Sequence, residues 1–204
     1  MITHSKRLNS VEEYYFSKKL REVSKMINSG KPVINMGIGS PDLYPSKNVI
    51  DEIKNSLSDP SAHKYQSYQG LPEFRKSISR FYQNYFQVDL KSESEVLPLM
   101  GSKEGIMHIS LAFLNPGDEV LIPNPGYPTY SSVTNLVEAK PRFYDLEENK
   151  NWFPDLTKLE KSDLSKVKLM WVNYPHMPTG ASVDLNQYKE LIEFAKRNNI
   201  LIVN

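Results

Sequence analysis

The second half of this sequence alternates between strand-like and helix-like patterns. Short apolar runs bounded by turn residues predict strands at 120–122, 142–144, 167–172 and 200–203. Apolar residues at helical spacing predict helices over 102–114, 127–136 and 184–197. Strands that take turns with helices usually pair in parallel and are covered by those helices. The chain is therefore predicted to have an α/β fold with a mainly parallel sheet flanked by helices.

The first hundred residues carry mostly helical patterns. Residues 10–13 have the form of a capping box and predict an N-terminal helix that Gly30 ends. Further helices are predicted over 46–57 and from Leu71 through Phe81, the latter with proline in its first turn. A short strand is predicted at 33–36, and the glycine turn that follows it, at 37–42, is a candidate binding loop.

Composition and charge exclude several classes of function. The chain has 25 basic and 24 acidic residues, so no strong field points to nucleic acid or an acidic membrane as a partner. It has no cysteine, which excludes disulfides, thiolate nucleophiles and cysteine-ligated metals. The four histidines are too scattered for zinc-ligand spacing, and no segment has the length of a bilayer span. We expect a soluble, cytoplasmic protein without a metal site.

The last predicted strand, 200–203, is apolar on both faces. Such a strand requires helices on both sides and usually neighbouring strands, because each buried aliphatic side chain is worth roughly 1.5–3 kcal/mol. The sequence stops at Asn204, one residue later. Two interpretations remain open: an edge strand covered by the earlier helices, or a sheet that is incomplete in this chain.

Three loops lie where predicted strands meet predicted helices. Residues 101–105 can hold a phosphate at the positive end of a helix, or form an ordinary helix start. Residues 123–130 fix Tyr127 between prolines, either as a rigid aromatic platform or as part of the core. Residues 173–180 form a proline-stiffened loop closed by Gly180. Because ligands bind at the carboxyl edge of parallel sheets, their joint order favours one binding site.

Taken together, these motifs resemble those of the class I/II aminotransferases, the fold-type I enzymes that use pyridoxal 5′-phosphate. The matching segments run in the family's order over nearly the whole chain, at 37–42, 64–65, 70–75, 101–105, 115–118, 123–130 and 173–180. The resemblance implies that residues 1–45 are the N-terminal arm and part of a small domain. Residues 46–204 would then be the first part of the large cofactor-binding domain, truncated at its C-terminus.

The resemblance also implies roles for single residues. After Gly101, the backbone amides of Ser102 and Lys103 would bind the cofactor phosphate, and Tyr127 would stack on the pyridine ring. Gly39 would help to hold the substrate α-carboxylate through its backbone. Tyr65 matches a tyrosine that reaches across a subunit interface to the partner's cofactor phosphate, which implies a homodimer.

One position departs from the family pattern. Asparagine usually precedes Pro-Thr-Gly and donates to the ring oxygen of the cofactor, but Met177 stands here. A thioether is only a weak acceptor and donates nothing. We hypothesise that this loss alters the acid–base behaviour of the cofactor, or that His176 supplies a substitute contact; alternatively Met177 packs beside the ring and neighbouring groups compensate.

Other family residues have no counterpart in these 204 residues. The lysine that forms the Schiff base, the aspartate that pairs with the pyridine nitrogen and the carboxylate-binding arginine would all come later. Lys103 does not fill the first role, because the first turn of a phosphate-binding helix points it away from the reacting carbon. The complete protein is expected to transfer an amino group between an amino acid and a 2-oxo acid. The alternatives are a carbon–sulfur lyase of the same family and a non-catalytic fragment.

Overall fold

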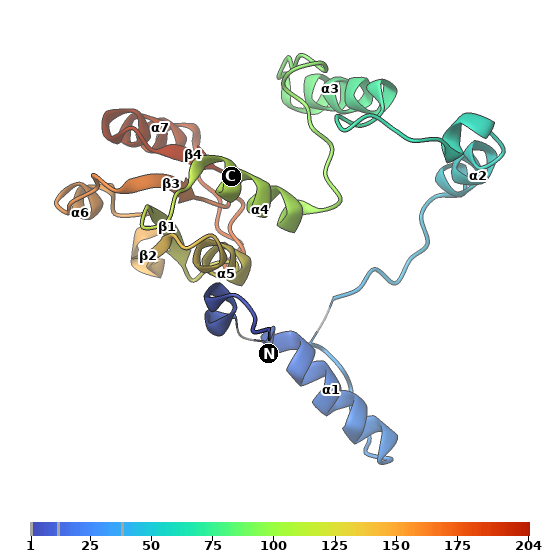
Figure 1. Ribbon diagram of the computed structural model, residues 1–204, viewed down its shortest axis with the longest axis horizontal. Helices are drawn as coiled ribbons and strands as arrows, with labels where there is room; N and C mark the ends of the chain where they lie inside the picture. Colours follow the sequence, from blue (N-terminus) through green and yellow to red (C-terminus); the bar gives the residue numbers. More distant parts are fainter. Residues whose placement is uncertain (1, 12, 38) are drawn as a thin grey trace. The chain divides into compact units, whose positions relative to one another are not determined.

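The computed structural model describes residues 2–11, 13–37 and 39–204, and the chain divides into two compact units. Unit 1 comprises Met1–Glu12 and Met100–Asn204, and unit 2 comprises Glu13–Leu99. The elements of both units are labelled in Figure 1. The predicted boundary between residues 45 and 46 concerns the domains of the family's full-length fold, and it stays a prediction.

Unit 1 is built on a four-stranded sheet in which every pair of neighbouring strands is parallel. The strands are β1 (Glu119–Asn124), β2 (Lys140–Asp145), β3 (Val167–Trp171) and β4 (Leu201–Val203). Their spatial order is β2-β1-β3-β4. The parallel sheet and the α/β class that the alternating pattern predicts are confirmed.

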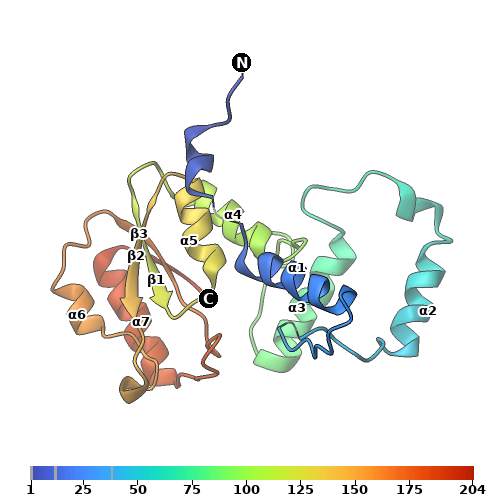
Figure 2. The ribbon, with the colours of Figure 1, turned by 90° about the horizontal axis from the view of Figure 1, so that it is seen from below.

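The helices of unit 1 cover both faces of this sheet (Figure 2). They are α4 (Ser102–Phe113), α5 (Pro128–Leu136), α6 (Leu156–Glu160) and α7 (Leu185–Asn198), with short 3-10 turns η1 (Lys6–Ser10) and η3 (Glu148–Lys150). The three longer α-helices lie where the sequence predicts them. The sequence analysis missed α6, because five residues are too few to show a helical period.

Alternate residues of β1 pack into two separate hydrophobic cores. Leu121 packs in a cluster with Met170 of β3 and with Leu191 and Phe194 of α7. Its neighbour Val120 points to the opposite face, into a cluster formed with residues of α4, α5 and β3. This division follows from the two-residue period of a strand, which sends successive side chains to opposite faces.

Two well-defined ends position α7 against the sheet. Asp184 and Gln187 form a capping box, in which each side chain accepts a hydrogen bond from the other residue's amide at 2.9 Å. At the other end, Asn199 adopts the left-handed conformation, with φ 55°, and turns the chain into β4. The helix therefore presents one apolar face to the sheet, and β4 follows it in the chain after Asn199 and Ile200.

β4 is the edge strand of the sheet in this structure. It pairs with β3 alone among the described residues, and the side chain of Leu201 is 39% exposed. Ile202 and Val203 are half-buried. This apolar strand is thus only partly covered by the described residues, and both interpretations of it stay open.

Unit 2 contains α1 (Tyr15–Asn28), α2 (Lys47–Ser56), a 3-10 turn η2 (Pro60–His63) and α3 (Pro72–Phe86). The helices predicted over 46–57 and from Leu71 are confirmed, with Leu71 as the N-cap of α3. The first helix begins later than predicted. Its N-cap is Tyr14, whose side chain makes no capping hydrogen bond. The predicted capping box at 10–13 includes Glu12, which lies outside the described residues.

The strand predicted at 33–36 is wrong. No strand is formed within 13–37, and Ile34 and Met36 are 87% and 90% exposed. A strand is stable only when a neighbour pairs with its backbone, and none of the described residues pairs with this segment. Within the described ranges, no helix is long and apolar enough to cross a membrane, and no group of three or more side chains could hold a metal ion.

Candidate functional site

The order of the strands creates a switch point between β1 and β3. From β1 the chain moves outward to β2, and then returns to the other side of β1 to form β3. The loops that leave the carboxyl ends of β1 and β3 therefore diverge, and open α/β sheets bind ligands in the crevice between such loops. These two loops, at 124–127 and 172–180, contain two of the three motifs singled out in the sequence.

The third motif forms the start of α4. Gly101 is its N-cap with φ 114°, a backbone conformation that favours glycine, and a Cβ built there would meet no atom within 4 Å. Ser102 begins the first turn, in which the Glu104 amide donates to the Gly101 carbonyl at 3.2 Å. The Glu104 carboxylate turns back and accepts a hydrogen bond from the Met100 amide at 2.5 Å. The structure thus provides open space at the positive end of a helix dipole.

Tyr127 connects this helix end to the loop after β1. The Lys103 ammonium lies 6.0 Å from the centroid of the Tyr127 ring, at the outer limit of a cation–π contact. Tyr127 also meets Tyr130 edge-on at 5.7 Å, and Tyr130 stacks on Trp171 of β3 at 4.7 Å. Tyr127 itself is half-buried. Its ring therefore rests on a stack that is anchored in the core, and it remains partly accessible.

The loop after β3 is held from two sides at Tyr174. The Tyr174 amide donates to the Asn204 side-chain oxygen at 2.8 Å, just beyond the end of β4. Its phenol donates to the carbonyl of Trp152, also at 2.8 Å. Burial raises the pKa of Tyr174 to about 12, so the phenol stays protonated and remains a donor at neutral pH.

His176 is the most deeply buried titratable side chain of this loop, with 3% of its surface exposed. Its Nδ1 atom lies 2.8 Å from the Thr179 hydroxyl. Its backbone closes a tight turn, with the His176 amide donating to the Ala181 carbonyl at 2.7 Å and the Gly180 amide donating to the His176 carbonyl at 2.6 Å. Burial lowers the pKa of His176, and the nearby Pro125 carbonyl opposes this shift.

The lowered pKa of His176 predicts that the free energy of unfolding falls as the pH drops below about 6.5. The unfolded chain takes up a proton on this ring before the folded chain does. The contribution is therefore fully present above pH 6.5 and is lost as the pH falls toward the folded-state pKa. Urea unfolding at about pH 7.5 and about pH 5.5 measures it, and His176→Gln should remove this part of the difference. An unchanged pH dependence in the variant would contradict the assignment.

The residues singled out in the sequence fall into two groups. Gly101, Ser102, Lys103 and Tyr127 lie in unit 1 around the start of α4 and the loop after β1. Met177 lies on the loop after β3, and its side chain is 47% exposed. Gly39 and Tyr65 belong to unit 2, so their participation in the site stays a prediction.

Several residues near the site were not found from the sequence. Tyr130 and Trp171 support Tyr127. These contacts join residues far apart in the chain, so no local pattern could indicate them. The sequence analysis did name His176, but only as a substitute for the asparagine that the family usually has at position 177.

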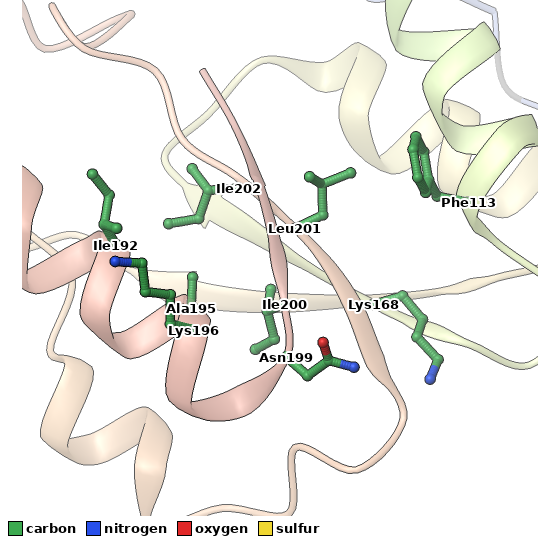
Figure 3. Close-up of a pocket in the computed structure, with 9 residues that line it drawn as sticks. All are labelled: Phe113, Lys168, Ile192, Ala195, Lys196, Asn199, Ile200, Leu201 and Ile202. Atoms are coloured by element: carbon green, nitrogen blue, oxygen red, sulfur yellow. The ribbon is translucent and has the colours of Figure 1, made fainter.

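A hollow of about 650 Å³ lies elsewhere, along the open edge of β4. In Figure 3, Phe113 and Lys168 lie on one side of β4, and Ile192 and Lys196 of α7 lie on the other. It adjoins Asn199 and Ile200, at the amino end of the strand. This hollow is therefore separate from the loops that follow the carboxyl ends of β1 and β3.

The residues at the carboxyl edge fit a phosphorylated aromatic ligand. The empty space beside Gly101 and the helix dipole suit a phosphate group. The half-buried ring of Tyr127 offers a surface for stacking on an aromatic ring. Fold and site together define a parallel α/β protein with candidate ligand-binding loops at the switch point of the sheet.

Comparisons with known proteins identify the family. The family model described as aminotransferase class I and II matches residues 31–204, and the chain belongs to this family. The family depends on pyridoxal 5′-phosphate, and the predicted cofactor is confirmed at this level.

The chain is 40% identical, over all 204 of its residues, to LL-diaminopimelate aminotransferase from Aquifex aeolicus (strain VF5), covering 53% of that protein. It resembles the apo structure of BacF from Bacillus subtilis with a TM-score of 0.93 and 33% identity, over 99% of this chain and 52% of the other. The alanine aminotransferase from Pyrococcus furiosus gives a TM-score of 0.87 at 29% identity, over 98% and 51%. The chain thus spans about half the length of the curated relatives it matches.

Proposed function

We propose that this chain is the cofactor-binding part of an aminotransferase that moves an amino group between an amino acid and a 2-oxo acid. The observation that carries the proposal is the meeting of Lys103 at the start of α4 with Tyr127 after β1, beside the switch point, in a member of this family. LL-Diaminopimelate is the proposed amino donor, because similar proteins carry that name.

The proposed roles of the residues follow from their positions. The amides that follow Gly101 bind the phosphate, and Tyr127 stacks on the ring, which limits its exposure to water. Pyridoxal 5′-phosphate supplies, when bound, an electron sink for bond cleavage at the α-carbon of the amino acid. Gly39 helps to hold the substrate carboxylate, and Met177 lies beside the ring. Each contact contributes to orientation, which is what makes the reacting geometry productive.

Two further features of the complete protein are proposed with this function. Tyr65 reaches the cofactor phosphate of a second copy, so the active form is a homodimer. Its side chain is fully exposed in this chain, as a residue that serves a partner would be. We propose that the dimer works in the cytoplasm.

The activity is tested with the full-length protein loaded with pyridoxal 5′-phosphate. LL-Diaminopimelate and a panel of 2-oxo acids are supplied, and the new amino acid and free ammonia are both quantified. Amino transfer that requires the 2-oxo acid is the expected result. Ammonia release without any 2-oxo acid would instead identify an eliminating enzyme of the carbon–sulfur lyase type.

Tyr127→Ala is expected to weaken the binding of pyridoxal 5′-phosphate by up to about tenfold, because aromatic stacking is worth about 0.5–1.5 kcal/mol. Tyr127→Phe keeps the ring and should bind within about twofold of the wild type. Equilibrium dialysis measures the affinity, and a thermal scan of each variant checks that the fold is intact. Equal affinities for the alanine and phenylalanine variants would remove Tyr127 from the site.

A further inference from the structure

We propose that Tyr144 is a positioning residue whose hydroxyl takes the place of the backbone amide proton that Pro123 lacks. The hydroxyl holds the carbonyl of Trp171 at the end of β3, and with it the aromatic stack that supports Tyr127. The replacement of the amide follows from the geometry of the sheet alone. Its consequence for the binding of pyridoxal 5′-phosphate rests on the proposed function.

Pro123 lies in a central strand, where proline is unusual. β1 is flanked by β2 and β3, and proline, which has no amide proton to donate, is mostly confined to edge strands, first residues and bulges. The irregularity in the pairing of β1 with β3 lies at the other end of the strand, between Glu119 and Val120. Pairing with β3 stops at Leu121, whereas pairing with β2 continues to Asn124. One carbonyl of a neighbouring strand is therefore left without a backbone donor.

The backbone groups of β1 alternate between its two neighbours. The Glu119 amide donates to the carbonyl of Lys166, the residue before β3, at 2.8 Å. The Asn124 carbonyl accepts from the amide of Leu146, the residue after β2, also at 2.8 Å. Because successive residues of a strand direct their backbone groups to opposite sides, odd-numbered residues of β1 face β3. An amide proton at position 123 would therefore point toward β3.

The carbonyl that faces position 123 is that of Trp171. Leu121 pairs with Met170, and an amide in a parallel pair donates to the residue before its partner. Two residues further along β1, the acceptor would therefore be the Trp171 carbonyl. The Val172 amide donates to β4 at 2.9 Å, so the backbone groups of the preceding residue face β1. Both strands thus identify the same acceptor.

The hydroxyl of Tyr144 supplies the missing donor. Tyr144 of β2 is the partner of Pro123 in the register, so the two side chains lie on the same face of the sheet. The phenol reaches across β1 and donates to the Trp171 carbonyl at 2.7 Å. Tyr144 is 5% exposed, and burial raises its pKa well above the ordinary value. The hydroxyl therefore keeps its proton and remains a donor.

Trp171 connects this hydrogen bond to the candidate site. Its indole stacks on Tyr130, with ring centroids 4.7 Å apart and planes 10° apart, and Tyr130 meets the ring of Tyr127 edge-on at 5.7 Å. Trp171 and Tyr130 are 3% and 7% exposed, so the stack has little room to rearrange. Without the hydroxyl, a buried carbonyl would be unpaired and the end of β3 would shift to find a donor. Tyr144 therefore fixes the base of the stack.

The test is a double-mutant cycle in the full-length protein. Tyr144→Phe removes the hydroxyl and keeps the ring, and Pro123→Ala supplies an amide proton at position 123. If the hydroxyl replaces that proton, the alanine compensates for the phenylalanine. The affinity for pyridoxamine 5′-phosphate is measured by equilibrium dialysis, because this probe has the phosphate and ring but no aldehyde to react with a lysine. The midpoint of urea unfolding is measured for the same four proteins.

Tyr144→Phe alone should weaken binding of the probe about three- to tenfold and lower the urea midpoint by about 0.5 M, as expected for one buried hydrogen bond. In the Pro123→Ala background, the same substitution should change the affinity by less than about twofold, because the new amide serves the Trp171 carbonyl. Folding of the double variant where Tyr144→Phe alone does not fold would be the same rescue.

Equal losses in the two backgrounds, or failure of both Tyr144→Phe proteins to fold, would overturn the replacement of the amide by the hydroxyl. A midpoint that falls and is rescued while the affinity of Tyr144→Phe equals that of the wild type would overturn the positioning of Tyr127. If the wild type itself does not bind the probe, the proposed function falls, and the urea midpoints alone decide whether Tyr144 replaces the amide of Pro123.

Discussion

Gly126→Ala is expected to destabilise unit 1 by about 1–3 kcal/mol and to displace the ring of Tyr127. The added Cβ would lie 2.3 Å from the carbonyl oxygen of Pro123 and 2.9 Å from its Cγ atom. The first of these atoms belongs to the backbone at the end of β1, so it cannot move aside as the end of a flexible side chain could. The turn after β1 must therefore open, and binding of pyridoxal 5′-phosphate should weaken together with stability. Urea unfolding and equilibrium dialysis measure the two effects.

Gly39→Ala is the matched control for the effect on stability. A Cβ at Gly39 meets no atom within 4 Å, so only a few tenths of a kcal/mol are expected there. If the alanine at position 126 proved as harmless as the one at position 39, the tight turn described here would not exist in solution. If stability fell while cofactor affinity stayed unchanged, the turn would not be what holds Tyr127.

Phe194→Ala should lower the free energy of unfolding by about 3–5 kcal/mol, the largest effect expected for a single substitution in this chain. Phe194 is 0% exposed, and it lies on α7 in the cluster that also contains Leu121 and Met170. Removing the ring loses its transfer free energy and leaves a cavity that α7 can close only in part. Denaturant unfolding, followed by circular dichroism, measures the change.

Ile192→Ala on the same helix provides the comparison. Ile192 is about half-exposed and lines the open hollow beside β4, so its truncation leaves no closed cavity. We expect a loss of about 1 kcal/mol or less. A loss at position 194 no larger than that at position 192 would show that this face of α7 is not packed against the sheet as described.

The elements of unit 1 could be predicted because their signals are local. The apolar run at 120–122 is short and bounded by turn residues, and it became β1. Residues 184–197 repeat apolar side chains at helical spacing, and they became α7. The prediction of a strand at 33–36 was wrong because its signal is local as well, whereas an apolar segment becomes a strand only when another strand pairs with it.

The candidate site was predictable in part. Gly101 and Tyr127 could be singled out because glycine and proline mark where strands end and loops begin. The contact between Lys103 and Tyr127 and the stack of Tyr130 on Trp171 could not. Each joins residues that are far apart in the sequence, and no local sequence pattern indicates such a contact.

The sequence by itself determined the class of fold and the places where the chain turns, because periodicity and turn chemistry act over a few neighbouring residues. Only the tertiary structure decided the strand order β2-β1-β3-β4 and the switch point between β1 and β3. It also decided that His176 is buried. Strand order depends on which apolar faces can be covered at once, so it is set by packing across the whole sheet and not by any one segment.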